Sequence, residues 1–139
     1  MSDTLATPTE ADRAELIRAN GRIRRVLRRF TEFFDDSTYR WIGSWQVTDH
    51  EHATVVTSQV EGSRLHAPVL DLDISHALVA SSTPGHSHLY LNVEMTWEKY
   101  RMLMCTLAEV GIISEDFARV SIEQGFSSVR VPGLSKNSL

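Results

Sequence analysis

The chain has 139 residues, of which 42% are apolar and 23% charged, and its formal net charge is −4. These values fit one globular domain. The negative net charge excludes an overall electrostatic attraction to nucleic acid or to an anionic membrane. No stretch is apolar for long enough to cross a bilayer. Cys105 is the only cysteine, so an internal disulfide is excluded and we expect a cytoplasmic protein.

A long basic helix over residues 7–36 is the first predicted element, and it follows a predicted disordered tail at residues 1–6. Thr7 suits the N-cap, and Glu10 completes a capping box with it. Apolar residues then recur at helical spacing along one face. Gly21 weakens the middle of this helix, so a bend or a break there is compatible with the pattern.

Arginine side chains crowd the second half of that predicted helix. One interpretation is a solvated face whose charges pair with nearby acids. The other is a patch that binds nucleic acid or a protein partner, because the guanidinium fork meets phosphate oxygens bidentately. The residues of this arginine patch are Arg22, Arg24, Arg25, Arg28 and Arg29.

Residues 37–139 are predicted to form a single α+β domain, with a mostly antiparallel sheet and helices on one face. Strand-like runs lie between turn signals, and two later segments have N-capping residues ahead of an apolar helical period. The predicted strands include residues 39–47, 53–60 and 127–131, and the predicted helices follow Thr96 and Ser114 and end near Gly111 and Gly125.

The central stretch, residues 69–92, contains two runs with the alternation of half-buried strands. In the first run Asp71 and Asp73 share one side, and in the second His88 and Tyr90 do. If both strands lie in one sheet with their apolar sides on the same core, these polar side chains share the other face. We therefore expect the two carboxylates to lie beside the imidazole of His88.

The carboxylates of Asp71 and Asp73 are candidate metal ligands. Two carboxylates at positions i and i+2 of a strand point the same way and can bind Mg²⁺ or Mn²⁺ through oxygen. Such ions align and neutralise phosphoryl groups. The alternative is that both are solvated side chains of an amphipathic strand, although aspartate is a poor strand former.

The turn between the two runs is a candidate anion site. The hydroxyls of Ser82 and Thr83 and the backbone amides can hold phosphate oxygens, and Gly85 lets the backbone approach closely. The alternative is a plain Pro-Gly turn without a ligand.

Two histidines and one arginine extend this candidate site. His88 is positioned to contact a phosphate or to transfer a proton, which makes it the one candidate catalytic residue. His86 shares that work or lies at the rim. Arg130 is the only charged residue of the last predicted strand, so we expect its guanidinium on the polar face, where it would complete an anion site.

Three segments resemble, in this order, landmarks of the archaeo-eukaryotic primase-polymerase superfamily. They are Leu-Asp-Leu-Asp at residues 70–73, Ser-Ser-Thr-Pro-Gly-His-Ser-His-Leu-Tyr-Leu at 81–91, and Val-Arg-Val-Pro-Gly-Leu-Ser-Lys at 129–136. The resemblance implies a metal held by one group of residues and nucleotide phosphates contacted by another. These groups are Asp71 and Asp73 for the metal, and His88, Arg130 and Lys136 for the phosphates.

The function expected from these observations is the binding of a nucleotide or of nucleic acid. The short gap between Asp73 and the Gly-His turn, and the lack of a third carboxylate on a strand after His88, imply a minimal or catalytically inactive relative. The chain is also similar to small proteins of actinobacteria and their phages that carry a like Ser-Ser-Thr-Pro-Gly-His run. The alternative is a non-enzymatic phage or mobile-element accessory protein that acts through protein contacts or self-association.

Overall fold

The structure is a computed structural model of the chain and describes residues 8–30, 34–35, 40–41 and 44–134. The described residues form three α-helices and seven β-strands, and their strand pairs are antiparallel. The α+β class and the antiparallel pairing are therefore confirmed, whereas the prediction of one sheet is wrong, because the described strands lie in separate sheets. Two compact units divide the chain between Asp71 and Leu72, whereas the sequence suggested a division after residue 36.

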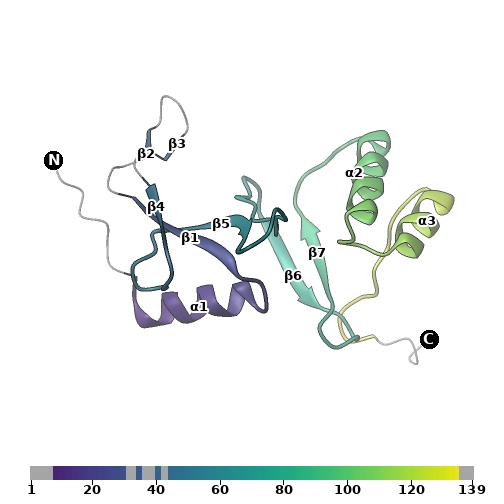
Figure 1. The fold of residues 1–139 in the computed structure, drawn as a ribbon. Helices are drawn as coiled ribbons and strands as arrows, with labels where there is room; N and C mark the ends of the chain where they lie inside the picture. The colour runs from purple at the N-terminus through teal and green to yellow at the C-terminus, as the bar shows by residue number, and fades with distance from the viewer. Residues whose placement is uncertain (1–7, 31–33, 36–39, 42–43, 135–139) are drawn as a thin grey trace. The chain divides into compact units, whose positions relative to one another are not determined.

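Figure 1 labels the helices and strands of both units. The helices are α1 (Glu10–Asn20), α2 (Trp97–Glu109) and α3 (Glu115–Gln124). The strands are β1 (Arg25–Phe30), β2 (Phe34–Asp35), β3 (Arg40–Trp41), β4 (Ser44–Val47), β5 (Val55–Val60), β6 (His76–Ala80) and β7 (Ser87–Leu91).

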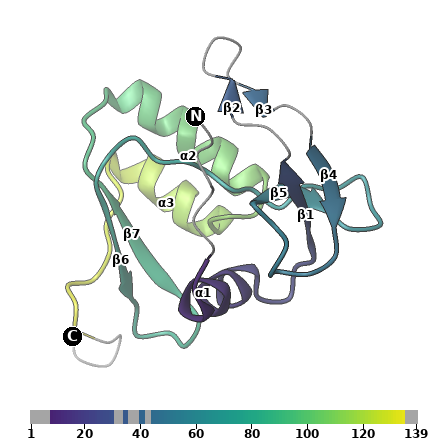
Figure 2. The ribbon, with the colours of Figure 1, turned by 90° about the vertical axis from the view of Figure 1, so that its left-hand side faces the viewer.

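A three-stranded antiparallel sheet in the order β4-β1-β5 forms the centre of the first unit (Figure 2). Leu27, in the middle of β1, lies opposite Val47 on one side and Val56 on the other. Its side chain is 6% exposed, and Ala53 and Ala67 are buried as well. The buried apolar core described in this unit is therefore small and centred on β1.

The long N-terminal helix predicted over residues 7–36 is wrong. α1 has 11 residues and is followed by Gly21, whose φ of 55° lies outside the helical region. Thr9 accepts a hydrogen bond from the Asp12 amide, and the Asp12 carboxylate accepts one from the Thr9 amide. This pair is the capping box of the helix. Thr7, the N-cap suggested by the sequence, lies outside the described residues.

β1 replaces the second half of the predicted helix because its backbone pairs on both sides. β4 and β5 flank it, and the Thr57 hydroxyl donates to the Val26 carbonyl at 2.8 Å. Helix propensity differences between residues are small, so tertiary pairing of this kind overrides the preference of arginine. The predicted disordered tail at residues 1–6 lies outside the described part of the chain.

The β6–β7 hairpin and the helices α2 and α3 make up the second unit. Thr96 caps α2 by accepting a hydrogen bond from the Lys99 amide, and Ser114 caps α3 by accepting one from the Phe117 amide. Gly125 ends α3 with a φ of 86°. Both helices predicted in this region are thus confirmed, with the same capping residues.

Helices α2 and α3 pack against each other. The buried side chains that they contribute are Met104, which is 1% exposed, and Ala118 and Ser121, at 5% and 1%. Ser121 satisfies its buried hydroxyl by donating to the Phe117 carbonyl at 2.7 Å. Helix–helix packing therefore supplies the buried side chains described in the second unit.

The final strand predicted over residues 127–131 is wrong, because this segment forms no strand in the structure. It returns along the β6–β7 hairpin, as both Figure 1 and Figure 2 show. Side chains hold it in place: the Tyr100 hydroxyl lies 2.6 Å from Ser127 Oγ, and Arg130 donates to Ser82. Arg130 therefore reaches the hairpin without belonging to its sheet.

Candidate functional site

The β6–β7 hairpin has two chemically different faces. Residues directly opposite each other in an antiparallel pair share a face. His88 lies opposite Val79 and shares its face with Tyr90, whereas Leu89 lies opposite Leu78 on the other face. Leu78 and Leu89 are 68% and 54% exposed, so the leucine face is open within the second unit.

Backbone hydrogen bonds fold the turn between β6 and β7. The Ser81 amide donates to the His86 carbonyl at 3.1 Å, and the His86 amide donates to the Thr83 carbonyl at 3.0 Å. Gly85 has a φ of 78°, which a residue with a Cβ rarely adopts. Among the described residues, the amides of Ser82 and Gly85 have no hydrogen-bond partner. These two donors can therefore bind an anion without breaking the turn.

The side chain of Ser81 organises this turn. Its Oγ accepts a hydrogen bond from the Thr83 amide at 3.2 Å and donates to the Thr83 carbonyl at 3.3 Å. A serine hydroxyl often bonds to the backbone two residues further on, so a serine ahead of a Pro-Gly pair is a signal for such a turn. Ser81 thus fixes the backbone next to the predicted site residue Ser82.

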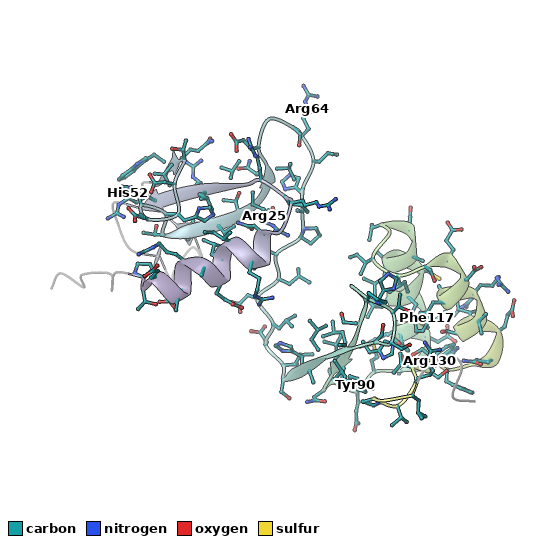
Figure 3. All side chains as sticks on the ribbon, turned by 90° about the horizontal axis from the view of Figure 1, so that it is seen from below. Arg25, His52, Arg64, Tyr90, Phe117 and Arg130 are labelled. Carbon is teal, nitrogen blue, oxygen red and sulfur yellow. The ribbon has the colours of Figure 1, made fainter. Side chains whose placement is uncertain are left out.

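Arg130 extends from the C-terminal segment to the same turn. Its Nη2 donates to Ser82 Oγ at 3.3 Å, across 48 positions of sequence. The residue is half-buried, and its Nε is buried without a hydrogen-bond partner among the described residues. A buried donor left unpaired costs about 1–3 kcal/mol. Figure 3 labels Arg130 in the second unit, together with Tyr90 of β7.

The strand predicted around Asp71 and Asp73 is wrong. Both residues are exposed and lie outside any strand, and β6 begins only at His76. The hairpin pairing ends where the Asn92 amide donates to the Ser75 carbonyl at 3.0 Å. Along the chain, the two carboxylates therefore precede the ladder and are not part of the sheet face that carries the imidazole.

The register of the hairpin explains why Asp71 and Asp73 do not extend β6. Continuing the observed pairing would set Asp73 opposite Glu94, and like charges directly opposite each other destabilise a ladder. It would also set Asp71 opposite Thr96, which is already the N-cap of α2. No strand residues remain to pair with the two aspartates.

A site for Mg²⁺ or Mn²⁺ at Asp71 and Asp73 stays a prediction. Carboxylate oxygens suit these hard cations. Within the described ranges, however, no group of three or more His, Cys, Asp or Glu side chains is arranged to hold a metal ion. The other ligands would therefore have to be water or the oxygens of a bound phosphate.

The other predicted site residues have different positions. The backbone of His86 closes the turn while its side chain is exposed, and His88 is half-buried in β7. Lys136 lies outside the described residues. The turn, Arg130 and β7 thus come together in one unit, and the catalytic role of His88 stays a prediction.

The arginine patch does not form one helical stripe. Arg22 and Arg24 lie between α1 and β1, and Arg25, Arg28 and Arg29 lie in β1. Because successive strand residues point to opposite faces, Arg28 and Arg29 do not present their side chains to the same side. A role of the patch in binding nucleic acid or a partner stays a prediction.

One residue of that patch, Arg25, has a structural role in the first unit. Its Nε and Nη2 donate to the carbonyls of Ala67 and Pro68, both at 3.3 Å. Its Nη1 donates to Asn20 Oδ1 at 3.1 Å. The guanidinium thereby ties the end of α1 to the segment after β5. Figure 3 labels Arg25 above α1.

Asp49 and His52 form a polar turn after β4. Asp49 Oδ1 accepts a hydrogen bond from the His52 amide at 2.9 Å and lies 2.7 Å from His52 Nδ1. These bonds, the side-chain one foremost, hold the pKa of the Asp49 carboxyl below its usual value. Arg29 Nη1 donates to the His52 carbonyl at 3.0 Å, which ties this turn to β1.

Comparisons with protein-family models, with curated proteins and with solved structures found no match for this chain. The resemblance to primase-polymerases therefore rests on the three sequence segments alone. In the part of the chain that the structure describes, no helix has the length and apolar character needed to span a membrane.

Proposed function

We propose that the second unit binds the phosphate groups of a nucleotide or of nucleic acid at the Ser81–His86 turn, with Arg130 as the cation. The observation that carries this proposal is the hydrogen bond from Arg130 to Ser82. This bond holds the guanidinium of Arg130 beside a turn that lies 48 positions earlier in the sequence.

The donors at this turn suit a phosphate. The amides of Ser82 and Gly85 and the Nε of Arg130 have no partner among the described residues. A phosphate oxygen that accepted from the buried Nε would remove the cost of an unpaired donor. Charge-assisted bonds from a guanidinium are also stronger than neutral ones. A bound phosphate would therefore accept hydrogen bonds from donors that otherwise have no partner at this turn.

The nucleotide part of the proposal comes from the resemblance to primase-polymerases. In that proposal His88 contacts the nucleotide, and Asp71 and Asp73 supply oxygens to Mg²⁺ or Mn²⁺. The protein would be a minimal or catalytically inactive relative in the cytoplasm.

The experiment is a calorimetric titration of the full chain with ATP, with and without Mn²⁺. Arg130→Gln removes the charge, and we expect it to weaken binding about ten-fold or more, as for loss of a charged hydrogen-bond donor. Arg101→Gln removes an exposed charge from α2 and should change the affinity by less than about two-fold. Equal affinities for the two variants, or no binding by the parent protein, would refute the proposal.

The role of the two aspartates needs a separate comparison. Asp71→Asn should abolish any gain in ATP affinity on adding Mn²⁺ while leaving the metal-free affinity unchanged. A Mn²⁺ effect that survives Asp71→Asn and Asp73→Asn would remove the metal from the proposal and leave the phosphate site.

The alternative is an accessory protein that acts through protein contacts or self-association. Five apolar side chains among the described residues of the second unit favour it, because each is at least 60% exposed: Leu78, Met102, Val110, Ile112 and Val131. Sedimentation of the parent protein and of Arg130→Gln separates the two functions. A stable oligomer without any ATP binding would support the alternative.

A further inference from the structure

The second unit contains an open cavity of about 490 Å³ between β7 and α2. Leu89 and Leu91 of β7 form one side, and Trp97, Tyr100 and Leu103 of α2 form the other. Among the described residues that line it, Glu94 is the charged one. A volume of this size accommodates a small ligand, and a lining of apolar and aromatic residues with a few polar groups is typical of ligand sites.

Two aromatic rings meet at this cavity nearly at right angles. The ring centroids of Trp97 and Tyr100 are 6.0 Å apart, and the planes are inclined by 75°. Thr96 caps the helix just before Trp97, and the Tyr100 hydroxyl is held at 2.6 Å from Ser127 Oγ. The Tyr100 ring is thus held at its hydroxyl, and the Trp97 ring packs against it.

We propose that this cavity binds an organic cation with an apolar body, of the alkylammonium class. Ring faces attract cations through their quadrupoles, most strongly in Trp, and quaternary ammonium groups are recognised by clusters of aromatic side chains. Glu94 supplies the opposite charge, and the leucines contact the alkyl chain. The juxtaposition of two rings, one carboxylate and a leucine wall therefore selects a cation over an anion.

One effect opposes the cation. Trp97 is the first residue of α2, and the N-terminal end of a helix carries a partial positive charge. Glu98 in the first turn reduces that charge, and the Thr96 side chain already accepts one of the free amides. Since one exposed cation–π contact is about as strong as one such helix-end interaction, two rings and a carboxylate outweigh the helix end.

The cavity is separate from the phosphate site. Leu89 and Leu91 share one face of the hairpin, whereas His88 and Tyr90 are on the other. The two ligand classes also have opposite charges. A failure of the cation proposal therefore leaves the phosphate proposal untouched, and the reverse holds as well.

The experiment titrates the full chain with three six-carbon probes of different charge: hexyltrimethylammonium, hexanol and hexanoate. We expect the ammonium probe to bind about ten-fold more tightly than hexanol, from two ring contacts and the carboxylate, and hexanoate to bind most weakly. Equal affinity for all three probes would contradict the proposal, because the cavity would then bind the hexyl chain without selecting its charge. Tightest binding of hexanoate, or no binding of the ammonium probe, would overturn the proposal.

Matched variants locate the binding. Glu94→Gln should weaken ammonium binding about three- to ten-fold and leave hexanol binding unchanged, whereas Glu109→Gln, which removes an exposed carboxylate at the far end of α2 and outside the lining, should change it less than about two-fold. Trp97→Leu keeps an apolar side chain and should cost about five- to ten-fold. If Trp97→Leu loses helical signal in circular dichroism, the comparison of Glu94→Gln with Glu109→Gln alone decides. Equal effects of those two variants would contradict the assignment.

Discussion

The helices of the two units are all well capped, yet they differ in what they bury. α1 has a complete capping box between Thr9 and Asp12 but no buried residue. α2 and α3 bury Met104, Ala118 and Ser121. Capping thus determines where a helix begins, and an apolar face determines whether it belongs to a core.

Because, of the three helices, only α2 and α3 bury side chains, we infer that the two units are stabilised by different interactions. In the second unit, burial between two helices supplies the free energy of folding. In the first, a three-stranded sheet around Leu27 and the hydrogen bonds of Arg25 do so. Four predictions test this comparison, from the largest expected effect to the smallest.

Met104→Ala should destabilise the second unit most. Met104 is 1% exposed, and truncating such a side chain typically lowers the free energy of unfolding by about 2–5 kcal/mol. Met102, two residues away, is 70% exposed, so Met102→Ala should cost less than about 0.5 kcal/mol. Urea unfolding monitored by circular dichroism measures both. Similar losses for the two variants would mean that the α2–α3 contact is not the source of stability.

Arg25→Leu should destabilise the first unit. It removes three hydrogen bonds and leaves the Ala67 and Pro68 carbonyls without a donor, for a loss of about 1–3 kcal/mol. Arg64, which Figure 3 also labels, is exposed, so Arg64→Leu is the control and should stay within about 0.5 kcal/mol. Hydrogen exchange of β1 and β5 amides follows the first unit specifically. Unchanged exchange in Arg25→Leu would show that the guanidinium is dispensable.

Replacing the N-caps sharpens the contrast between the helices. Thr96→Ala and Ser114→Ala should each lower the stability of the second unit by about 1 kcal/mol. Thr9→Ala should reduce the helicity of α1 by a similar local amount but change global stability little, because α1 buries no residue. Thermal unfolding and residue-resolved exchange distinguish these effects. A large global loss in Thr9→Ala would mean that α1 contributes to a core.

The smallest predicted effect is a pH dependence at the Asp49–His52 turn. Because folding lowers the Asp49 pKa, this carboxylate stabilises the turn above the ordinary aspartate pKa of 3.8, and the contribution is lost as the pH falls through the lowered value. NMR titration of Asp49 should show the lowered pKa, and His52→Ala should bring it back toward the ordinary one. An unchanged titration in His52→Ala would exclude that hydrogen bond as the cause.

The sequence sufficed for the second unit's helices because several local signals agree there. Thr96 and Ser114 precede apolar helical periods, and Gly125 ends α3 with a positive φ. The first unit lacked that agreement. The arginine-rich segment after Gly21 has helical spacing, and only the strands paired on both sides of it make it β1.

The candidate site divides in the same way. The turn from Ser81 to His86 follows from its own residues, so its position could be predicted. The strand expected around Asp71 and Asp73 could not be excluded by alternation alone. Its pairing depends on where the opposite strand ends, and β7 ends at Leu91, ahead of the N-cap of α2 at Thr96. The contact of Arg130 with Ser82 joins distant segments, so local pattern suggested only the face, not the partner.

The most direct measurement of the phosphate proposal is the NMR signal of the Arg130 Nε–H group during titration with ATP. This donor is buried and has no partner among the described residues. We predict that its resonance moves downfield as a phosphate oxygen accepts from it, together with the amides of Ser82 and Gly85. A titration that shifts only arginines of the first unit, or leaves the Arg130 signal in place while ATP binds, would contradict the account.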